Sequence, residues 1–360
     1  MPHAKPYALV SDQHFHSWNK FNTVNENGIN SRLQYQLNEL KRAADELRAA
    51  GGNLIINAGD TFHVRGSLAP SVLNPVLDLH RALVDDGFEI IVLAGNHDLE
   101  GKDAARLTSA ATSLESVGCR VISSPDPESW IVYGNLVMVP WFDSVAMLKE
   151  KLEALPVLPR GNMDLILHAP VDGVILGIPD HGLTGDYLAG LGFRRVFSGH
   201  YHNHKEIVPG KVWSIGATTH QTWSDINTKA GFLLVGEDVK WRKSHAPEFV
   251  QIAPEDEEED VMTAVPGNYV RAFIDSQAKT KDVAEVRALL ESYGAKGVVL
   301  IPAPKAGAAR AAGVTAIAST GTLEESVTAY VNAQDFSSKV DVAQLCASIL
   351  NQARLEAAAE

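Results

Sequence analysis

Five short segments rich in aspartate and histidine follow one another within the first 202 residues, and each comes directly after a short apolar run. The segments are Ser11–His14, Ala58–Asp60, Gly95–Asp98, Leu167–His168 and Gly199–His202. A mixed set of imidazole and carboxylate ligands suits Mn²⁺, iron or Zn²⁺ better than Ca²⁺, and the absence of thiolates argues against a structural zinc site. The pattern therefore indicates a centre for two divalent ions, which is suited to the hydrolysis of phosphate esters.

Each segment alone is a weak signal. An Asp-x-His pair such as Asp12 and His14 is more often a loop hydrogen bond, and Asn96–Asp98 could be a helix cap. The combination of all five segments carries the prediction. Asp60 lies in the middle of the order and is the natural carboxylate to bridge two ions about 3.5–4 Å apart. His97 can give a proton to the leaving oxygen if it is not itself a ligand.

The apolar runs that precede these segments predict buried strands separated by helices. The expected strands are Tyr7–Val10, Leu54–Ile56, Ile90–Leu93, Leu165–Leu167 and Val196–Phe197. Leucines at helix spacing predict a helix between residues 30 and 51, which Ser31 can cap, and a second helix is expected over 72–84. This alternation is typical of an α/β fold with a largely parallel sheet covered by helices, and later apolar runs suggest a second sheet.

The chain of 360 residues is long enough for more than one domain. We expect a main domain over residues 1–250, a solvated acidic linker over 254–260, a small α+β domain over 261–305 and a helical segment over 320–360. No apolar run approaches the roughly 20 residues of a membrane span, and no signal-peptide pattern opens the chain. With two isolated cysteines that we expect to be reduced, these features predict a cytoplasmic protein with no membrane contact.

The net charge of −13 argues at first against nucleic acid, because phosphate contacts need lysine and arginine. The charge is uneven, however: residues 191–245 contain eight Lys or Arg against four Asp or Glu. Two bound cations would also cancel much of the acidity at the site. The charge weakens a nucleic-acid interpretation without excluding it.

The order D-x-H, G-D, G-N-H-D, H and G-H-x-H resembles the calcineurin-like metallophosphoesterases over residues 7–235. The resemblance implies a two-sheet sandwich flanked by helices, followed by a smaller capping domain and C-terminal helices. It also implies that seven residues hold two ions: Asp12, His14, Asp60 and His202 the first, and Asp60, Asn96, His168 and His200 the second. His97 would be the proton donor, oriented by Asp98.

The segment Gly59-Asp60-Thr61-Phe62-His63 resembles the Gly-Asp-x-Phe-His of SbcD-type double-strand-break repair nucleases. In that subfamily the extra histidine, here His63, lies near the metals and the DNA backbone. The resemblance implies a nuclease that uses two divalent ions, preferably Mn²⁺, to process DNA ends in recombination or repair with an SMC-like ATPase subunit of the SbcC type. It leaves a homodimer open, because helices near 72–84 and 104–117 occupy the places through which the family dimerises.

Two other functions remain open. A small-molecule phosphodiesterase, for example one acting on cyclic nucleotides, fits the same motifs, and the net charge mildly favours it. A non-catalytic scaffold is the third hypothesis, against which the complete ligand set argues. Among the other histidines, His16 and His181 could line the cleft or be loop residues, and His204 is expected to be exposed. His220 could touch a substrate phosphate, but a surface loop is the favoured interpretation.

Overall fold

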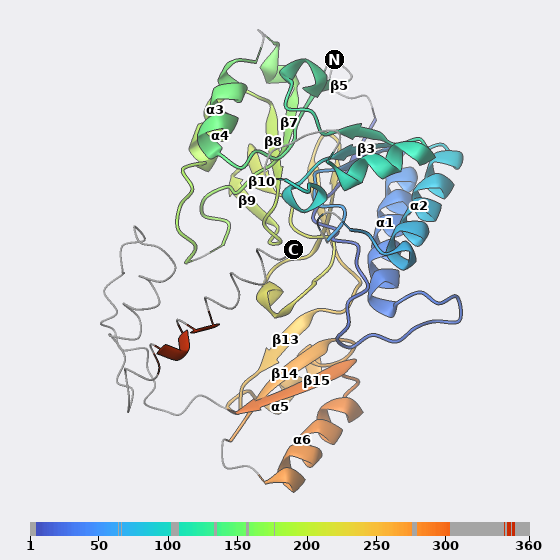
Figure 1. Cartoon of the computed structure of the whole chain (residues 1–360), viewed down its shortest axis with the longest axis vertical. Helices are drawn as coiled ribbons and strands as arrows, with labels where there is room; N and C mark the ends of the chain where they lie inside the picture. The colour runs from blue at the N-terminus through green and yellow to red at the C-terminus, as the bar shows by residue number, and fades with distance from the viewer. Residues whose placement is uncertain are drawn as a thin grey trace. The chain divides into compact units, whose positions relative to one another are not determined.

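The computed structural model of the chain describes residues 5–302, apart from positions 64, 66, 102–107, 133–134, 156–157, 176 and 276–278, and also positions 342, 344–346, 348 and 349. The described residues up to 301 outside the Asp275–Gln277 segment belong to one compact unit, and the six positions near the C-terminus belong to another. Figure 1 shows the chain, with labels on many of its helices and strands.

The first large sheet is mixed, with the strand order β12-β11-β1-β2-β3-β4. Its strands are β1 (Tyr7–Val10), β2 (Leu54–Asn57), β3 (Glu89–Leu93), β4 (Arg120–Ile122), β11 (Gly231–Val235) and β12 (Val239–Lys243). Strands β1 to β4 are parallel to one another, while β11 runs antiparallel to β1 and β12 antiparallel to β11. The strands predicted from the apolar runs are therefore confirmed.

The second large sheet has the order β5-β6-β7-β8-β10-β9. Its strands are β5 (Ile131–Val132), β6 (Leu136–Val139), β7 (Asp164–His168), β8 (Arg195–Gly199), β9 (Lys205–Val208) and β10 (Val212–Ser214). Strands β6, β7, β8 and β10 run parallel. The two sheets share one apolar core, as expected of a two-sheet sandwich.

Alternate residues of β1 show how the layers are built. Tyr7 and Leu9 belong to the core between the two sheets. Ala8 and Val10 belong to a second core, which also contains the apolar side chains of the two long helices. Because successive strand residues point to opposite faces, a four-residue apolar run buries both faces of the first sheet.

Helices connect the strands, and the two longest cover the outer face of the first sheet. The helices are α1 (Ser31–Ala49), α2 (Pro70–Asp85), α3 (Val145–Glu153) and α4 (Gly185–Gly190), with 3₁₀ helices η1 (Asn96–Asp98), η2 (Ala110–Val117), η3 (Pro127–Trp130), η4 (Arg160–Asn162) and η5 (Trp223–Asp225). Among the helices in the described part of the chain, none combines the length and the apolar character needed to cross a membrane.

Two helix predictions need correction. The cap of α1 is Asn30, whose side chain accepts hydrogen bonds from the N–H groups of Arg32 and Leu33. Ser31 is occupied elsewhere, because its hydroxyl accepts a hydrogen bond from the N–H of Thr23. The helix expected over 104–117 is a 3₁₀ helix that starts at Ala110, and positions 104–107 lie outside the described residues. A homodimer through this region stays a prediction.

A third, smaller sheet follows the two large ones, with the order β13-β14-β15. Its elements are β13 (Phe249–Ile252), α5 (Glu258–Ala264), β14 (Tyr269–Ile274), α6 (Thr280–Ser292) and β15 (Gly297–Pro302). The acidic run is only partly a linker, because three of its carboxylates form the first turn of α5, where the helix dipole favours negative charge.

The three-part division of the chain stays a prediction, and its first boundary at residue 250 lies inside β13. The helical segment expected over 320–360 lies outside the described residues, except for six positions, all of which are helical.

A buried polar cluster joins the two large sheets at the amino-terminal ends of their strands. The Tyr7 hydroxyl on β1 donates a 2.7 Å hydrogen bond to the carboxylate of Asp164 on β7. Arg194 and Arg195 also donate to this carboxylate, each through two nitrogen atoms. Burial alone would raise the pKa of Asp164, but the arginine hydrogen bonds outweigh burial and hold that pKa below its ordinary value.

Replacing this carboxylate tests how much the cluster contributes to stability. We expect Asp164→Asn to lower the free energy of unfolding by roughly 3–5 kcal/mol at neutral pH, because it removes one partner of a buried ion pair. Tyr7→Phe, which removes a single hydrogen bond, should cost about 1 kcal/mol. Urea denaturation measures both, and an Asp164→Asn variant as stable as the original protein would contradict the assignment.

The stability lost in Asp164→Asn should also depend on pH. The pKa of Asp164 is lower in the folded protein than its ordinary value, so its stabilisation is present above that value and is lost as the pH falls through the folded pKa. The stability difference between the original protein and Asp164→Asn should therefore narrow below about pH 4. A difference that stays constant down to the acid transition would argue against an ionised Asp164.

Candidate metal centre

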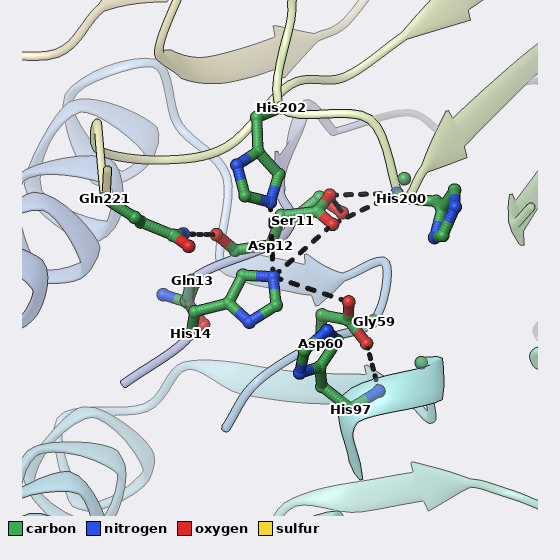
Figure 2. A network of polar contacts seen from close by, with 12 residues as sticks. Ser11, Asp12, Gln13, His14, Gly59, Asp60, His97, His200, His202 and Gln221 are labelled. Carbon is green, nitrogen blue, oxygen red and sulfur yellow. Dashed lines mark hydrogen bonds and ion pairs between the residues drawn. The ribbon is translucent and has the colours of Figure 1, made fainter. Parts of the chain in front are cut away.

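The five motif segments lie at the carboxyl ends of five strands. They follow or end β1, β2 and β3, which are neighbours in the first sheet, and β7 and β8, which are neighbours in the second. Parallel strands present their carboxyl ends at the same edge of a sheet, so the segments of each sheet meet there. Figure 2 shows His202, from the loop after the second-sheet strand β8, pointing toward His14 and Asp60 of the first sheet.

Asp60 lies at the centre of this group. Its Oδ2 atom is 3.4 Å from Nε2 of His14 and 3.4 Å from Nε2 of His168. Its other oxygen accepts a 2.8 Å hydrogen bond from the backbone N–H of His97 (Figure 2). One carboxylate oxygen therefore faces imidazoles from both sheets, which is the position that a ligand shared by two ions needs.

The first potential metal group contains Asp12, His14 and His202, whose ligand atoms lie within 4.8 Å of one another. The Nε2 atoms of His14 and His202 are 3.3 Å apart. Nδ1 of His202 lies 2.8 Å from the carboxylate of Asp225. This contact assigns the ring proton to Nδ1 and leaves the Nε2 lone pair directed at the group.

The second group contains Asp60, His168 and His200, again within 4.8 Å of one another. Asn96 completes it, because its Oδ1 atom is 3.2 Å from Nε2 of His168 and 3.0 Å from Nδ1 of His200. Nδ1 of His168 lies 2.8 Å from the carbonyl oxygen of Ala58. That hydrogen bond again leaves Nε2 free to bind an ion.

The donor distances test whether the residues fit metal ions. Ligand atoms held about 2.1 Å from one ion lie roughly 3.0–3.5 Å apart, given tetrahedral or octahedral angles. The separations around Asp60, His14, His168 and His202 lie between 3.3 and 3.4 Å. Two facing imidazole nitrogens that both carry lone pairs repel each other unless a cation lies between them. The two groups therefore fit a pair of divalent ions.

The electrostatics of the histidines agree with this fit. Burial lowers the pKa of His14 well below its ordinary value and lowers that of His200 to about 3, so both rings stay neutral, the form that binds metal. Burial would also lower the pKa of His168, but the carboxylate of Asp60 outweighs it and raises that pKa to about 9. Asp60 thus attracts a positive charge at the position where an ion would lie.

Backbone strain is concentrated at the same residues. Asp12, His14, Asp60 and His200 have φ values of 48°, 45°, 53° and 95°. They are four of the six non-glycine residues with positive φ in the described part of the chain. Such conformations cost of the order of 1–3 kcal/mol each and are typical of functional sites.

Two motif glycines are required by close approach. Gly59 has a φ of 107°, and a Cβ atom there would overlap the imidazole of His168. A Cβ atom at Gly95 would overlap the carboxylate of Asp60. Any larger residue at either position would displace a side chain of the centre.

The ring of His97 is oriented by a backbone carbonyl and not, as the resemblance implied, by the carboxylate of Asp98. Nδ1 of His97 lies 2.7 Å from the carbonyl oxygen of His63, so this carbonyl orients the ring and leaves Nε2 free. The carboxylate of Asp98 accepts hydrogen bonds from the N–H groups of Thr61, Phe62 and Gly95. Asp98 therefore holds the loops after β2 and β3 together and acts on His97 through the backbone.

Of the remaining histidines, His63 and His16 lie near the metal centre, while His181 and His204 lie away from it. His63 lies beside the centre, with its Nδ1 atom 3.4 Å from Nδ1 of His14, and His16 contacts His63 at 5.1 Å between ring centroids. His181 is an exposed loop residue. The prediction that His204 is exposed is wrong, because its ring stacks on Trp241 and Nδ1 contacts the carbonyl of Ser214.

His220 is buried too, not in a surface loop. Its Nδ1 atom accepts a hydrogen bond from the N–H of Phe249 on β13. Its Nε2 atom lies 3.1 Å from the carbonyl oxygen of Thr228.

Sequence reasoning missed two supporting residues. The carboxylate of Asp225 holds His202 and also accepts hydrogen bonds from the N–H groups of Gln221 and Thr222. The side chain of Gln221 donates to the carbonyl oxygen of Asp12 (Figure 2). The Thr222-x-x-Asp225 spacing is a capping-box signal for a helix start, but it gives no indication of a contact with His202.

Comparisons with known proteins agree with this geometry. Residues 5–204 match the family model described as calcineurin-like phosphoesterase. Exonuclease subunit 1 of Enterobacteria phage T4 is 27% identical over 202 residues, which cover 55% of this chain and 57% of that protein. The chain therefore spans a little over half the length of this relative.

Solved structures similar to the chain share little sequence with it. Nuclease MPE of Pseudomonas putida is 16% identical with a TM-score of 0.30, covering 66% of this chain and 87% of that one. A dimetal phosphatase from Danio rerio is 14% identical with a TM-score of 0.40, covering 67% of this chain and 96% of that one.

Asp225 provides a test of the first metal group. We expect Asp225→Ala to weaken binding of Mn²⁺ roughly 10–100-fold, because His202 loses the partner that fixes its proton on Nδ1. Asp225→Asn keeps an oxygen acceptor, so its affinity for Mn²⁺ should lie between those of the original protein and Asp225→Ala. Calorimetric titration of chelator-treated protein measures the affinity, with the exposed Asp78→Ala as a control. Equal affinity in all four proteins would show that Asp225 does not support the site.

Proposed function

Because the chain belongs to the calcineurin-like phosphoesterase family, we propose that it is a metal-dependent DNA nuclease that hydrolyses phosphodiester bonds at a two-ion centre. The observation that carries the proposal is the position of Asp60, whose Oδ2 atom faces His14 and His168 at equal distances. A single-ion site would not need a carboxylate oxygen shared by two groups of ligands.

The assignment of ligands follows the two groups. Asp12, His14, Asp60 and His202 would hold one ion, and Asp60, Asn96, His168 and His200 would hold the other. When bound, two such ions would activate a water molecule and neutralise the phosphoryl oxygens. The nitrogen-rich donor set favours a transition metal, and we propose Mn²⁺.

His97 is the proposed proton donor to the leaving oxygen. Its ring is T-shaped against His14, with 4.6 Å between centroids, and it stacks on His63. Because Nδ1 is held by the carbonyl of His63, Nε2 is the atom that can carry the proton toward substrate. Asp98 contributes by fixing the loop that carries His97.

DNA is proposed as the substrate for two reasons. The matched phage protein is named an exonuclease subunit and is 27% identical over 202 residues. His63 also lies next to the ligand His14, where it can contact a phosphate of the substrate backbone. Since the relative is named as a subunit, we further propose that this chain works with an SMC-like ATPase partner in recombination or repair.

The proposal is tested by supplying ions and substrates side by side. Chelator-treated protein should regain cleavage of end-labelled linear DNA with Mn²⁺ but not with Ca²⁺, and Asp60→Asn should stay inactive. Duplex DNA, single-stranded DNA and cyclic AMP are compared in parallel. Full activity in excess chelator would contradict the two-ion centre, and cleavage of cyclic AMP without cleavage of DNA would contradict the choice of substrate.

Two variants separate proton donation from metal binding. His97→Ala should keep both ions, because the bond between its backbone N–H and Asp60 is retained, and should slow cleavage by about 10²–10⁴-fold. His200→Ala should lose metal as well as activity. Metal content is measured by elemental analysis of the desalted proteins. If His97→Ala loses metal as completely as His200→Ala, His97 is a metal ligand and its assignment as proton donor is wrong.

A further inference from the structure

A buried arginine, Arg32, lies at the start of α1 and makes no direct ion pair with a described residue. The side chain of Arg32 is buried, and the carboxylate whose negative charge acts on it is that of Asp225, which does not contact it directly. The guanidinium lies over the rings of Trp18, Phe249 and Tyr269, at 5.0, 5.2 and 5.4 Å from their centroids. Burying a cation is costly, so its retention here needs an explanation beyond packing.

The hydrogen bonds of Arg32 fix its position. Its guanidinium donates to the carbonyl oxygens of Gln221 and Lys20. Gln36, one turn further along α1, donates to the carbonyls of Gln13 and His14 and accepts from the N–H of His16. Because residues four apart share a helix face, one side of α1 supports the whole loop that follows β1.

The indole of Trp18 contacts both this arginine and the metal centre. Its ring centroid is 4.4 Å from that of His63, with the planes 45° apart. His16 packs edge-on against the same indole and also contacts His63. A stiff aromatic ring that is itself held by Arg32 therefore lies against His63.

The imidazole of His63 is half-exposed, and aromatic neighbours surround its other side. It stacks on His97 with planes 16° apart and contacts His14 through the two Nδ1 atoms. The distance to Trp18 is the shortest of its ring-to-ring distances among the described residues. Removal of the indole would let the imidazole of His63 turn away from His97 and His14.

We propose that Trp18 and Arg32 are positioning residues, which hold the His63 imidazole in the orientation that the proposed nuclease reaction requires. Trp18 acts by contact with His63, and Arg32 acts by contacting the ring of Trp18 while it also lies over Phe249 and Tyr269 of the third sheet. The inference rests on the proposed function for its kinetic consequence. A displacement of about 1 Å at such a group can slow a reaction about 10²-fold.

The first test does not depend on activity. Diethyl pyrocarbonate modifies accessible imidazoles, and peptide mass spectrometry gives the rate at each histidine of the metal-free and Mn²⁺-loaded full-length protein. We expect Trp18→Ala to raise the rate at His63 several-fold and Trp18→Phe to restore it, while the rate at the exposed His181 stays the same in all proteins. An unchanged rate at His63 in Trp18→Ala would overturn the proposal.

The second test is a double-mutant cycle on linear DNA. Trp18→Ala should lower kcat about 10- to 100-fold with KM and metal content unchanged, and Arg32→Lys, which lacks the planar guanidinium, should act in the same direction. If Trp18 acts through His63, adding Trp18→Ala to His63→Ala should cause no further loss. If the fold-losses in kcat of the two single variants multiply in the double variant, the proposal is overturned.

The two tests separate this inference from the proposed function. An original protein that cleaves no DNA with any ion would refute the nuclease proposal, while the modification rate at His63 would still decide the positioning role. A thermal melt of each variant identifies loss of fold, and Trp18→Phe and Arg32→Lys supply milder changes if Trp18→Ala unfolds.

Discussion

The shared position of one oxygen atom, Oδ2 of Asp60, constrains the rest of the structure. It faces His14, which follows β1 of the first sheet, and His168, which ends β7 of the second. Both sheets must therefore present their carboxyl strand ends at one edge and pack closely enough for side chains to meet. The glycine at position 59, the left-handed backbone of Asp60 and the hydrogen bond from His97 all serve this arrangement.

Stability and chemistry are placed at opposite ends of the same strands. At the amino-terminal ends, Asp164 joins Tyr7 and Arg195 in a buried cluster whose hydrogen bonds are satisfied. At the carboxyl ends, Asp12 and His200 hold strained backbone conformations. The two ends are joined by a rigid apolar core. The stability that the cluster contributes can therefore offset the cost of the strained backbone at the metal centre.

Local patterns predicted most of the fold and the positions of the five motif segments at strand ends, because such patterns depend on neighbours in sequence. The apolar run Tyr7–Val10 specifies a buried strand whatever follows it, and the aspartates and histidines after such strands meet because parallel strands end together. The role of Asp225 was missed, and His220 and the helix cap were placed wrongly, because these roles depend on particular partners. Asp225 holds His202 and His220 holds Phe249, contacts that no local spacing encodes. Asn30 caps the helix, while the hydroxyl of Ser31 accepts from Thr23 instead.

The sequence separation within the first metal group has a consequence for biosynthesis. His14 and His202 are 188 positions apart, and Asp225 comes later still. More than half of the chain must therefore be synthesised before the group can close around an ion. Contacts between residues so far apart in sequence also form slowly in folding. Until then the nascent chain offers Asp12, His14 and Asp60 but lacks His202, the ligand that the second sheet contributes. If the proposed residues hold an ion, loading with metal would therefore depend on completion of both sheets, and an ion in the first position would mark a chain that has already folded.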